Sequence, residues 1–483
     1  MKELFRQWAG TAPSQCLSLG ANGSSRRYYR LSCSSENSER TAIGCINDDI
    51  QENEAFFSYA QHLRSRGINV PEVYAISADR RTYLQQDLGD TTLYDILRQK
   101  KQKGGGFDRQ MLLLYEQALS DLASIQIAGA DADFSHAYPR PEFDRQSILW
   151  DLNYFKYHFL KLTHTPFHEQ HLEDDFNTLA DTLLSADTNY FLYRDFNPRN
   201  IMVGLNSELY YIDFQGGRRG AAQYDVASLL YSAKSDLPEP IRQHLLNHYL
   251  DSRQLEGDNR QQWIRHFWSY VLVRILQTLG AYGYRGLFEH KEYFLQSIPL
   301  ALNNLQQLIQ NHPQLLSQLP ELRKVIEGIE YSPIVSSTSV SNAVLPSQTL
   351  TVSVCSFSYK NNLPTDPSGN GGGFIFDCRA LPNPGRYTQY KNYTGKDLPV
   401  IQFLQQQQPV DQFLSHAFAL VAQSVDKYFE RNFTHLQVAF GCTGGQHRSV
   451  YCAEQLAKRL SEQYPSINIC LRHIAQEPCE NLK

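Results

Sequence analysis

The chain has 483 residues, about three times the usual domain length, which predicts two or three domains. Hydrophobic residues make up 42% and charged residues 20% of it, and this balance excludes a disordered, collagen-like or coiled-coil protein. The net charge of -5 excludes a general basic footprint for nucleic acid, although a local basic patch is compatible with it.

The sequence contains no apolar run of about 18 residues, so no transmembrane helix is predicted. Its first ten residues, MKELFRQWAG, are too polar for a signal peptide. Nine cysteines are scattered without Cys-x-x-Cys pairs, which is typical of a protein with reduced thiols and no zinc site. We therefore expect a cytoplasmic protein without a membrane partner.

The first 90 residues are rich in strand patterns separated by Gly and Ser turns. Five runs predict strands: 16–20, 28–32, 41–46, 73–77 and 82–88. Residues 49–67 predict a helix that ends at a Gly C-cap, with Phe56, Ala60 and Leu63 on one face.

Residues 91–330 show mostly helical patterns, interrupted by two short apolar strands around 190–214. Residues 331–350 are rich in Ser, Thr and Pro and carry no charge, which predicts a tether between two globular parts. The tail from 351 alternates strands with helices, and this alternation predicts an α/β layer fold.

The segment FLYRDFNPRNIMVGLNSELYYIDFQGG, residues 191–217, carries a candidate phosphotransfer site. Asn200 follows Asp195 by five residues, and Asp213 ends the apolar strand thirteen residues later. Phosphoryl transfer to an alcohol needs a carboxylate near the hydroxyl and oxygen ligands for Mg²⁺, which prefers hard oxygen donors. Asp and Asn also favour turns, but the spacing of all three favours phosphotransfer.

The motifs YRDFNPRN and IDFQGG resemble the catalytic and metal loops of aminoglycoside-phosphotransferase-like kinases. The longer run IDFQGGRRGAAQYDVASLLY resembles bacterial anomeric kinases that phosphorylate N-acetylmuramate and N-acetylglucosamine in cell-wall recycling. The resemblance covers about residues 1–330 and implies ATP and Mg²⁺ as cofactors. It implies that Asp195 is the catalytic base and that Asn200 and Asp213 bind the metal.

Two further residues of this region are assigned through the same resemblance. Asp225 matches a family aspartate that we interpret as mainly structural. Tyr193 stands where many relatives have His, a departure that we expect to change packing rather than chemistry.

The segment GANGSSRRYYRLS, residues 20–32, resembles the hairpin that covers the nucleotide phosphates in these kinases. Its Gly and Ser residues let backbone N–H groups approach phosphate oxygens. The kinase lysine of the third strand is missing, because no Lys occurs between Lys2 and Lys100. Arginine suits bidentate phosphate contact and is a candidate replacement. The candidate nucleotide-binding residues here are Gly23, Ser24, Ser25, Arg26, Arg27 and Arg30.

The alternative is that these arginines are solvated hairpin residues. Glu52 or Glu54 lies where the glutamate that pairs with the missing lysine is expected. The segment QQDLGD, residues 85–90, resembles the hinge between the kinase lobes, where Gln86 and Leu88 are candidates for holding adenine.

The helical segment SILWDLNYFKYHF, residues 147–159, gathers aromatic and polar side chains. Trp150, Asp151 and Asn153 are candidate sugar contacts. The alternative is a core position, because aromatic residues at helical spacing pack in cores more often than they bind ligands.

The segment HLQVAFGCTGGQHRSVYCAEQLAKRL, residues 435–460, predicts a strand, a Gly-rich loop and a helix. A Gly-rich turn at a helix N-terminus places backbone N–H groups around an anion, and the helix dipole assists. The candidate phosphate-binding residues are Thr443, Gly444, Gly445, His447 and Arg448. Cys442, Arg448 and Ser449 also satisfy the tyrosine-phosphatase pattern Cys-x5-Arg-Ser, in which a thiolate is the nucleophile.

A longer resemblance competes with the phosphatase pattern. The motifs SFSYKNNLP, FIFDCRALPNP, YTGKDLPVIQFL and FGCTGGQHRSVY resemble, over 352–475, the C-terminal domain of the RNase adapter protein RapZ. That resemblance implies binding of glucosamine-6-phosphate and regulatory protein or RNA partners. Asn361 and Gly385 stand where that family commonly has His, which puts the sugar selectivity in doubt.

The expected fold is a two-lobed α+β protein-kinase-like domain followed by a separate α/β domain. The expected parts are an N-lobe (1–90), a C-lobe (91–330), a linker (331–350) and a RapZ-like sugar-phosphate-binding domain (351–483). The expected function is an ATP-dependent sugar kinase of amino-sugar recycling joined to a regulatory sugar-phosphate sensor. The alternatives are a pseudokinase scaffold, an aminoglycoside phosphotransferase and a phosphatase in the tail.

Overall fold

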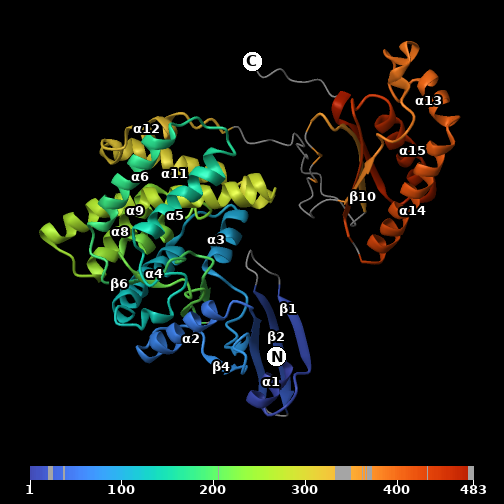
Figure 1. Cartoon of the computed structure of the whole chain (residues 1–483). Helices are drawn as coiled ribbons and strands as arrows, with labels where there is room; N and C mark the ends of the chain where they lie inside the picture. The colour runs from blue at the N-terminus through green and yellow to red at the C-terminus, as the bar shows by residue number, and fades with distance from the viewer. Residues whose placement is uncertain are drawn as a thin grey trace. The chain divides into compact units, whose positions relative to one another are not determined.

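The computed structural model describes most of the chain. The residues outside the description are 20–25, 36–37, 205, 332–349, 362, 365, 367–372, 432 and 477–483. The chain divides into two compact units, Met1–Pro333 (unit 1) and Ile334–Lys483 (unit 2), drawn in Figure 1. Of the predicted linker 331–350, only Tyr331 and Leu350 lie among the described residues. Within the described ranges, every helix is too short or too polar to span a membrane.

Unit 1 begins with an antiparallel sheet whose five strands have the order β1-β2-β3-β5-β4. Its elements are α1 (Lys2–Ala9), β1 (Gln15–Leu19), β2 (Arg27–Ser35), β3 (Ser38–Ile46), α2 (Ile50–Ser65), β4 (Val73–Ile76) and β5 (Thr82–Gln85). The five predicted strands and the helix over 49–67 are confirmed. Helix α1 was not predicted; it buries Phe5 against Leu31 and Leu84 of the sheet.

Helix α2 begins at Asp49, whose carboxylate accepts a hydrogen bond of 3.1 Å from the backbone N–H of Glu52. Such an N-cap satisfies one of the free donors of the first turn. The predicted face of Phe56, Ala60 and Leu63 is buried. This helix therefore holds a fixed position beside the sheet, with Glu52 in its first turn.

The second part of unit 1 is mostly helical. Its helices are α3 (Leu93–Gln102), α4 (Arg109–Ala128), α5 (Arg145–Phe155), α6 (Glu169–Leu184), α7 (Gln223–Leu230), α8 (Glu239–Ser252), α9 (Gly257–Tyr282), α10 (Glu292–Leu295), α11 (Ile298–Asn311) and α12 (Pro320–Glu327). Its strands are β6 (Tyr190–Leu192), β7 (Ile201–Val203), β8 (Leu209–Tyr211) and β9 (Arg218–Gly220). They form two antiparallel pairs, β6 with β9 and β7 with β8. The sequence predicted only two strands here, because three-residue strands give too short a pattern.

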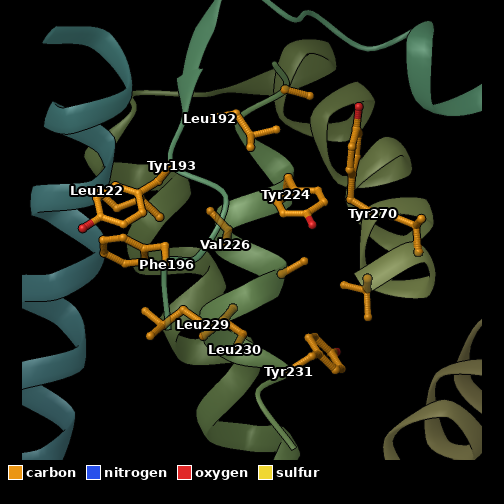
Figure 2. Close-up of a cluster of buried hydrophobic side chains, with 14 of the residues drawn as sticks. Leu122, Leu192, Tyr193, Phe196, Tyr224, Val226, Leu229, Leu230, Tyr231 and Tyr270 are labelled. Carbon is orange, nitrogen blue, oxygen red and sulfur yellow. The ribbon is translucent and has the colours of Figure 1, made fainter. Parts of the chain in front are cut away.

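Helix α7 is the centre of this helical part, and all eight of its residues are buried. Figure 2 shows it between α4, which contributes Leu122, and α9, which contributes Tyr270. Tyr193, which follows β6, packs into the same cluster. Close packing of this kind resists displacement, so α7 is a rigid support for the loop that follows β6.

Unit 2 is a parallel sheet of four strands in the order β11-β12-β10-β13, covered by helices. Its elements are β10 (Thr351–Ser358), β11 (Gly373–Asp377), α13 (Leu398–Gln405), α14 (Gln408–Glu430), β12 (His435–Cys442), α15 (Arg448–Gln463) and β13 (Asn468–His473). Leu414, Val421 and Val425 of α14 join one buried cluster with Val438 of β12. Strands that alternate with helices in a parallel sheet confirm the predicted α/β fold.

Candidate functional site

The structure brings the three predicted phosphotransfer residues together. Asn200, just before β7, donates one side-chain N–H to the backbone carbonyl of Asp195, at 2.9 Å. The same amide nitrogen donates to Oδ2 of Asp213, at 3.1 Å. Asp213 follows β8, which pairs with β7, so the strand pair places the two loops side by side. The Asn200 amide thus joins the catalytic loop to the loop that carries Asp213.

Buried groups hold the catalytic loop in place. Asp225 of α7 accepts hydrogen bonds from the backbone N–H groups of Tyr193 (2.7 Å) and Arg194 (2.9 Å). The Tyr193 hydroxyl donates to the carbonyl of Ile212, at 2.7 Å, one residue before Asp213. These contacts support the structural interpretation of Asp225. They also give Tyr193 a packing role between the two loops.

Two residues of these loops have left-handed backbone conformations that favour glycine. Arg194 has φ = 81° and Asp213 has φ = 69°. A non-glycine residue in this region is strained, and it persists where the surrounding contacts determine its conformation. The hydrogen bonds of Tyr193 and Asp225 supply such contacts.

The surroundings of Asp195 raise the pKa of its carboxyl group. Burial and the nearby Asp213 carboxylate raise the pKa of Asp195, while the guanidinium of Arg194 opposes that rise. A raised pKa makes a carboxylate a better proton acceptor from a hydroxyl. Burial also raises the pKa of Asp225 to about 7, against the hydrogen bonds from Tyr193 and Arg194.

Arg26 stands directly before β2 and is the hairpin arginine that reaches the site. Its side chain is only 3% exposed, and its Nη2 lies 2.8 Å from Oε1 of Glu52 on α2. Its Nη1 lies 3.7 Å from Oδ1 of Asp213. One helical turn after Glu52, the Phe56 ring stacks on Phe214 with centroids 5.1 Å apart. Helix α2 therefore positions both the arginine and the loop of Asp213.

The other predicted hairpin residues lie elsewhere. Arg30 forms ion pairs with Asp87 (2.7 Å) and Asp90 (2.8 Å), so it ties β2 to the segment after β5. Arg27 is exposed. The structure therefore corrects the expectation for Arg30, whose guanidinium is already held by two carboxylates. The predicted Gly23, Ser24 and Ser25 lie outside the described residues.

The predicted adenine-holding segment forms the connection between β5 and α3. The backbone N–H of Gln86 donates to the carbonyl of Glu72, at 2.8 Å, which extends the edge of the sheet. Leu88 is partly exposed. Gly89 has φ = 81°, which suits a glycine, and its N–H donates to Asp87 at 3.1 Å. This turn and the Arg30 ion pairs fix the course of the segment.

The predicted sugar contacts do not line the cavity beside Asp195. Asp151 is 5% exposed, and both of its carboxylate oxygens accept hydrogen bonds from Arg194, at 2.6 and 2.7 Å. Trp150 of the same helix is 46% exposed. Asn153 lies one turn further along α5. The structure therefore corrects the expectation for Asp151, because its carboxylate is committed to the residue before Asp195.

The cavity beside Asp195 has a volume of about 300 Å³. Its walls come from α3, the catalytic loop, the turn after α7, α9 and α10. The polar and aromatic members of its lining are Tyr94, Asp195, Asn197, Arg199, Ser228, Tyr231, Ser232, Lys234, Arg274, Gln277, Thr278, Tyr282, Tyr293 and Phe294. Sequence reasoning missed most of them, because they share no local pattern. Arg199 is the exception, because it lies inside the RDFNPRN motif. Its position next to Asn200 could have indicated that it belongs to the site.

Asn200 and Asp213 form a donor set that fits Mg²⁺. They offer an amide oxygen and a carboxylate, and Mg²⁺ in kinases takes one or two carboxylates together with substrate phosphates and water. Among the described residues, no group of three or more His, Cys, Asp or Glu side chains forms a metal site. A site completed by nucleotide phosphates agrees with that finding.

In unit 2, the Gly-rich loop joins β12 to the N-terminus of α15, as predicted. It borders a cavity of about 210 Å³ lined by Asn383, Gly385, Lys391, Cys442, Thr443, Gly444, Gln446, His447 and Arg448. Gly445 has φ = 65°, and a Cβ there would lie 2.4 Å from that of Ala475. The loop therefore needs glycine at this position. Lys391 and Asn383, which the sequence did not single out, add a cation and an amide to the cavity.

Side chains at the start of α15 brace this loop. Arg448 is buried, and its Nη1 donates to the carbonyls of Arg379 (2.7 Å) and Leu381 (3.1 Å). The His447 ring Nε2 lies 3.0 Å from the carbonyl of Tyr390. Arg448 therefore fixes the segment 379–381, and His447 fixes the segment around Tyr390, in both cases through backbone carbonyls.

Cys442 lies at the end of β12, with its Sγ 3.1 Å from the hydroxyl of Ser449. Burial alone raises the pKa of its thiol, but hydrogen bonds from Ser449 and the Gly445 N–H, with the Arg448 charge, lower it overall. The direction of this pKa shift is the one that the phosphatase pattern needs. Its arginine, however, is bonded to backbone carbonyls.

Comparisons with known proteins agree with the two-unit organisation. The model of the phosphotransferase enzyme family matches residues 20–262, half of the chain, and that of the RapZ C-terminal domain matches residues 350–475. A nucleotide-binding protein of Delftia acidovorans is 31% identical over 217 residues, covering 44% of this chain and 69% of that protein. One of Saccharophagus degradans is 39% identical over 123 residues, covering 26% of this chain and 41% of that protein.

Two solved structures are also similar to this chain. A choline kinase of Cryptosporidium parvum is 14% identical with a TM-score of 0.45, covering 63% of this chain and 92% of its own. A thermostable mutant of aminoglycoside phosphotransferase APH(4)-Ia is 14% identical with a TM-score of 0.41, covering 64% and 99%. The family model over residues 20–262 by itself shows that the chain belongs to the phosphotransferase enzyme family, whose members transfer phosphoryl groups to hydroxyl acceptors, and the second unit matches the model of the RapZ C-terminal domain.

Proposed function

We propose that unit 1 is an ATP-dependent kinase that phosphorylates a cell-wall-derived amino sugar at its anomeric hydroxyl. The observation that carries this proposal is the Asn200 amide, which bonds to both Asp195 and Asp213. The choice of an amino sugar rests on the resemblance of residues 212–231 to the anomeric kinases. The cysteine usage favours the cytoplasm as its location.

The chain's own residues have separate roles in this reaction. Asp195 orients the acceptor hydroxyl and accepts its proton as the phosphoryl group is transferred. Arg26, held by Glu52, places a positive charge beside Asp213, where the nucleotide phosphates bind. Asn200 and Asp213 hold Mg²⁺, which neutralises charge on the phosphates when bound. The backbone after β5, at Gln86 and Leu88, faces the adenine.

Arg26 also bears on the pseudokinase alternative. The missing lysine of the third strand motivated that alternative. Arg26 and Glu52 restore a cation–carboxylate pair between the sheet and α2. The function of an active kinase is therefore favoured over that of a scaffold.

A screen of the purified chain tests this function. ADP release is measured with N-acetylglucosamine, N-acetylmuramate, glucosamine and an aminoglycoside, and phosphorus NMR of the product identifies the phosphorylated hydroxyl. We expect turnover with an amino sugar and a product phosphorylated at the anomeric carbon. Turnover with the aminoglycoside alone would favour the antibiotic-modifying alternative, and no turnover with any acceptor would favour the scaffold.

For unit 2 we infer a binding site for a hexosamine phosphate, which senses a product of the pathway. The cavity beside Thr443 and Gly444 combines backbone N–H groups, the N-terminus of α15 and Lys391. These groups match a phosphate monoester. A regulatory protein or RNA partner of this unit is part of the same proposal, because the RapZ resemblance implies both.

A further inference from the structure

The cavity beside Asp195 is lined by more cationic than anionic side chains. Three cationic side chains line it, Arg199, Lys234 and Arg274, whereas Asp195 is the only carboxylate among its described lining residues. They come from three separate elements: the catalytic loop, the turn after α7, and α9. Converging cations without matching anions are costly, because each repels the others.

Among the described residues, no carboxylate pairs with the Lys234 ammonium. Its ammonium donates to the backbone carbonyl of Tyr293, at 3.1 Å, and lies against the rings of Tyr293 and Phe294. Within the described ranges, it forms no ion pair. Burial, followed by the charge of Arg199, lowers the pKa of Lys234 to about 6. Burial and the neighbouring guanidinium therefore disfavour the protonated form of this side chain.

The two arginines of this cavity, like Lys234, contact neutral groups. The guanidinium of Arg199 stacks over Tyr94 and Tyr293, at 4.9 and 4.5 Å from the ring centroids. Arg274 donates to three neutral oxygens, those of Tyr224 (3.0 Å), Ser228 (2.9 Å) and Gln277 (2.7 Å). In the described part of the chain, neither arginine has a carboxylate within ion-pair distance.

Other buried cationic side chains of unit 1 form ion pairs with carboxylates. Lys156, 1% exposed, contacts the carboxylates of both Glu169 and Glu173. Arg194 is bonded through two nitrogens to Asp151. Buried charges in proteins are generally paired in this way. The cations around the Asp195 cavity thus lack the internal partner that the same unit provides elsewhere.

We propose that this cavity is the acceptor site and that Lys234 and Arg199 bind an anionic group, a carboxylate or phosphate, on the hydroxyl acceptor. The proposal deepens the proposed kinase function and rests on it for the identity of the acceptor as a sugar. An anion between the two cations supplies the missing countercharge, while Asp195 faces the hydroxyl. A polycationic acceptor is disfavoured, because it would meet the charges of Arg199 and Arg274 and would further disfavour protonation of Lys234.

Matched sugars test the charge preference. N-acetylglucosamine is neutral, N-acetylmuramate adds a carboxylate to the same ring, N-acetylglucosamine-6-phosphate adds a phosphate, and glucosamine adds a positive charge. We expect at least one anionic sugar to raise the melting temperature and to have a KM at least tenfold below that of its neutral counterpart. The carboxylate and phosphate arms distinguish the two sources of negative charge.

The variant Lys234→Met removes the charge and keeps most of the side chain. We expect it to raise the KM of the anionic sugar about tenfold more than the KM of the neutral sugar, with Lys234→Arg restoring the preference. Lys103→Met, at the exposed C-cap of α3, is the matched control and should change neither value.

Isothermal titration calorimetry in buffers of different ionisation enthalpy measures the protons taken up on binding. A purely structural role of Lys234 would not change that number. Binding of an anion at pH 7.5 should be accompanied by proton uptake in the wild type and not in Lys234→Met, because the anion favours the protonated amine.

The outcomes separate this inference from the proposed function. Binding of an anionic sugar that depends on Lys234, without phosphoryl transfer, supports the inference and contradicts the kinase proposal. Equal kcat/KM for neutral and anionic sugars supports an amino-sugar kinase and overturns the inference. Absence of binding by every anionic sugar also overturns it.

Discussion

The two proposed phosphate sites, one in each unit, are built differently. In unit 1, charged side chains from distant segments converge: Arg26 from the start of β2, Glu52 from α2, and Asp195, Asn200 and Asp213 from two loops of the helical part. In unit 2, one continuous loop before α15, residues 442–448, supplies most of the residues that line a cavity.

This difference determines how each site tolerates substitution. A site made of single side chains loses a specific charge or proton acceptor with each substitution. A site made of backbone N–H groups keeps its donors whatever the side chains are, and loses them only if the loop changes course. The first site should therefore be far more sensitive to single substitutions than the second.

The largest effect is expected for Asp195→Asn. Loss of the proton acceptor should lower kcat by about 10²–10⁴-fold, without unfolding the chain. A coupled ADP assay and the melting temperature check this. Asp258→Asn, at an exposed position of α9, is the control and should retain full activity. Wild-type turnover by Asp195→Asn would remove the catalytic assignment.

Two adjacent arginines provide the next test. Arg26→Met should lower kcat or raise the KM for ATP by about tenfold or more, equivalent to ~1.4 kcal/mol, because its charge lies between Glu52 and Asp213. Arg27→Met should change both values by less than about twofold, since Arg27 is exposed. If the two variants behave alike, Arg26 does not replace the missing lysine.

Arg30→Met sharpens the same comparison. Its expected effect is a lower melting temperature, because the ion pairs with Asp87 and Asp90 would be lost. A selective rise in the KM for ATP without loss of stability would return Arg30 to the phosphate site.

A smaller effect is expected in unit 2. In the full chain, Arg448→Ala should weaken binding of glucosamine-6-phosphate about tenfold, ~1.4 kcal/mol, because the carbonyls of Arg379 and Leu381 would lose their donor. Cys442→Ser should change binding by less than about twofold. Calorimetry and a phosphate-release assay measure both properties. Phosphate release that depends on Cys442 would instead identify unit 2 as a phosphatase.

The smallest effect concerns Lys234 and pH. Its pKa is lowered from 10.5 to about 6 in the folded chain, so the unfolded chain binds more protons between these pH values. The free energy of unfolding should therefore rise with pH above 6, with a slope of at most about one proton. Partial solvent exposure of Lys234 reduces this slope. Melting temperatures from pH 6 to 9 should show the rise in the wild type and a flatter profile in Lys234→Met.

Local sequence patterns were sufficient for a large part of the architecture. The strands of the first sheet, helix α2 and the strand–loop–helix around 442–449 follow from periodicity and turn residues over short windows. Helix α1 was not predicted, and only two of the four three-residue strands of the helical part were. Their patterns are too short, and α1 is stabilised by contacts with distant residues such as Leu31 and Leu84.

Tertiary contacts decided the fate of individual polar residues. Asp151 looked available for a ligand until the structure showed its two hydrogen bonds with Arg194. Arg30 was equivalent to Arg26 in the sequence, yet its guanidinium lies between two carboxylates after β5. Such competition between partners has no local signature, because the partners are tens of residues apart.

The sequence by itself predicted that Asp195, Asn200 and Asp213 lie close together, because their spacing is that of two adjacent loops, and the Asn200 amide contacts both aspartates in the structure. It also determined the loop at 442–449, because that strand, turn and helix start form one segment, whereas Asn383 and Lys391 reach the same cavity from distant positions. Only the tertiary structure decided which hairpin arginine lies beside Asp213 and which cations line the cavity beside Asp195. The physical reason is that these positions depend on the packing of α2, α7, α9 and α10, which brings together side chains that no short pattern relates.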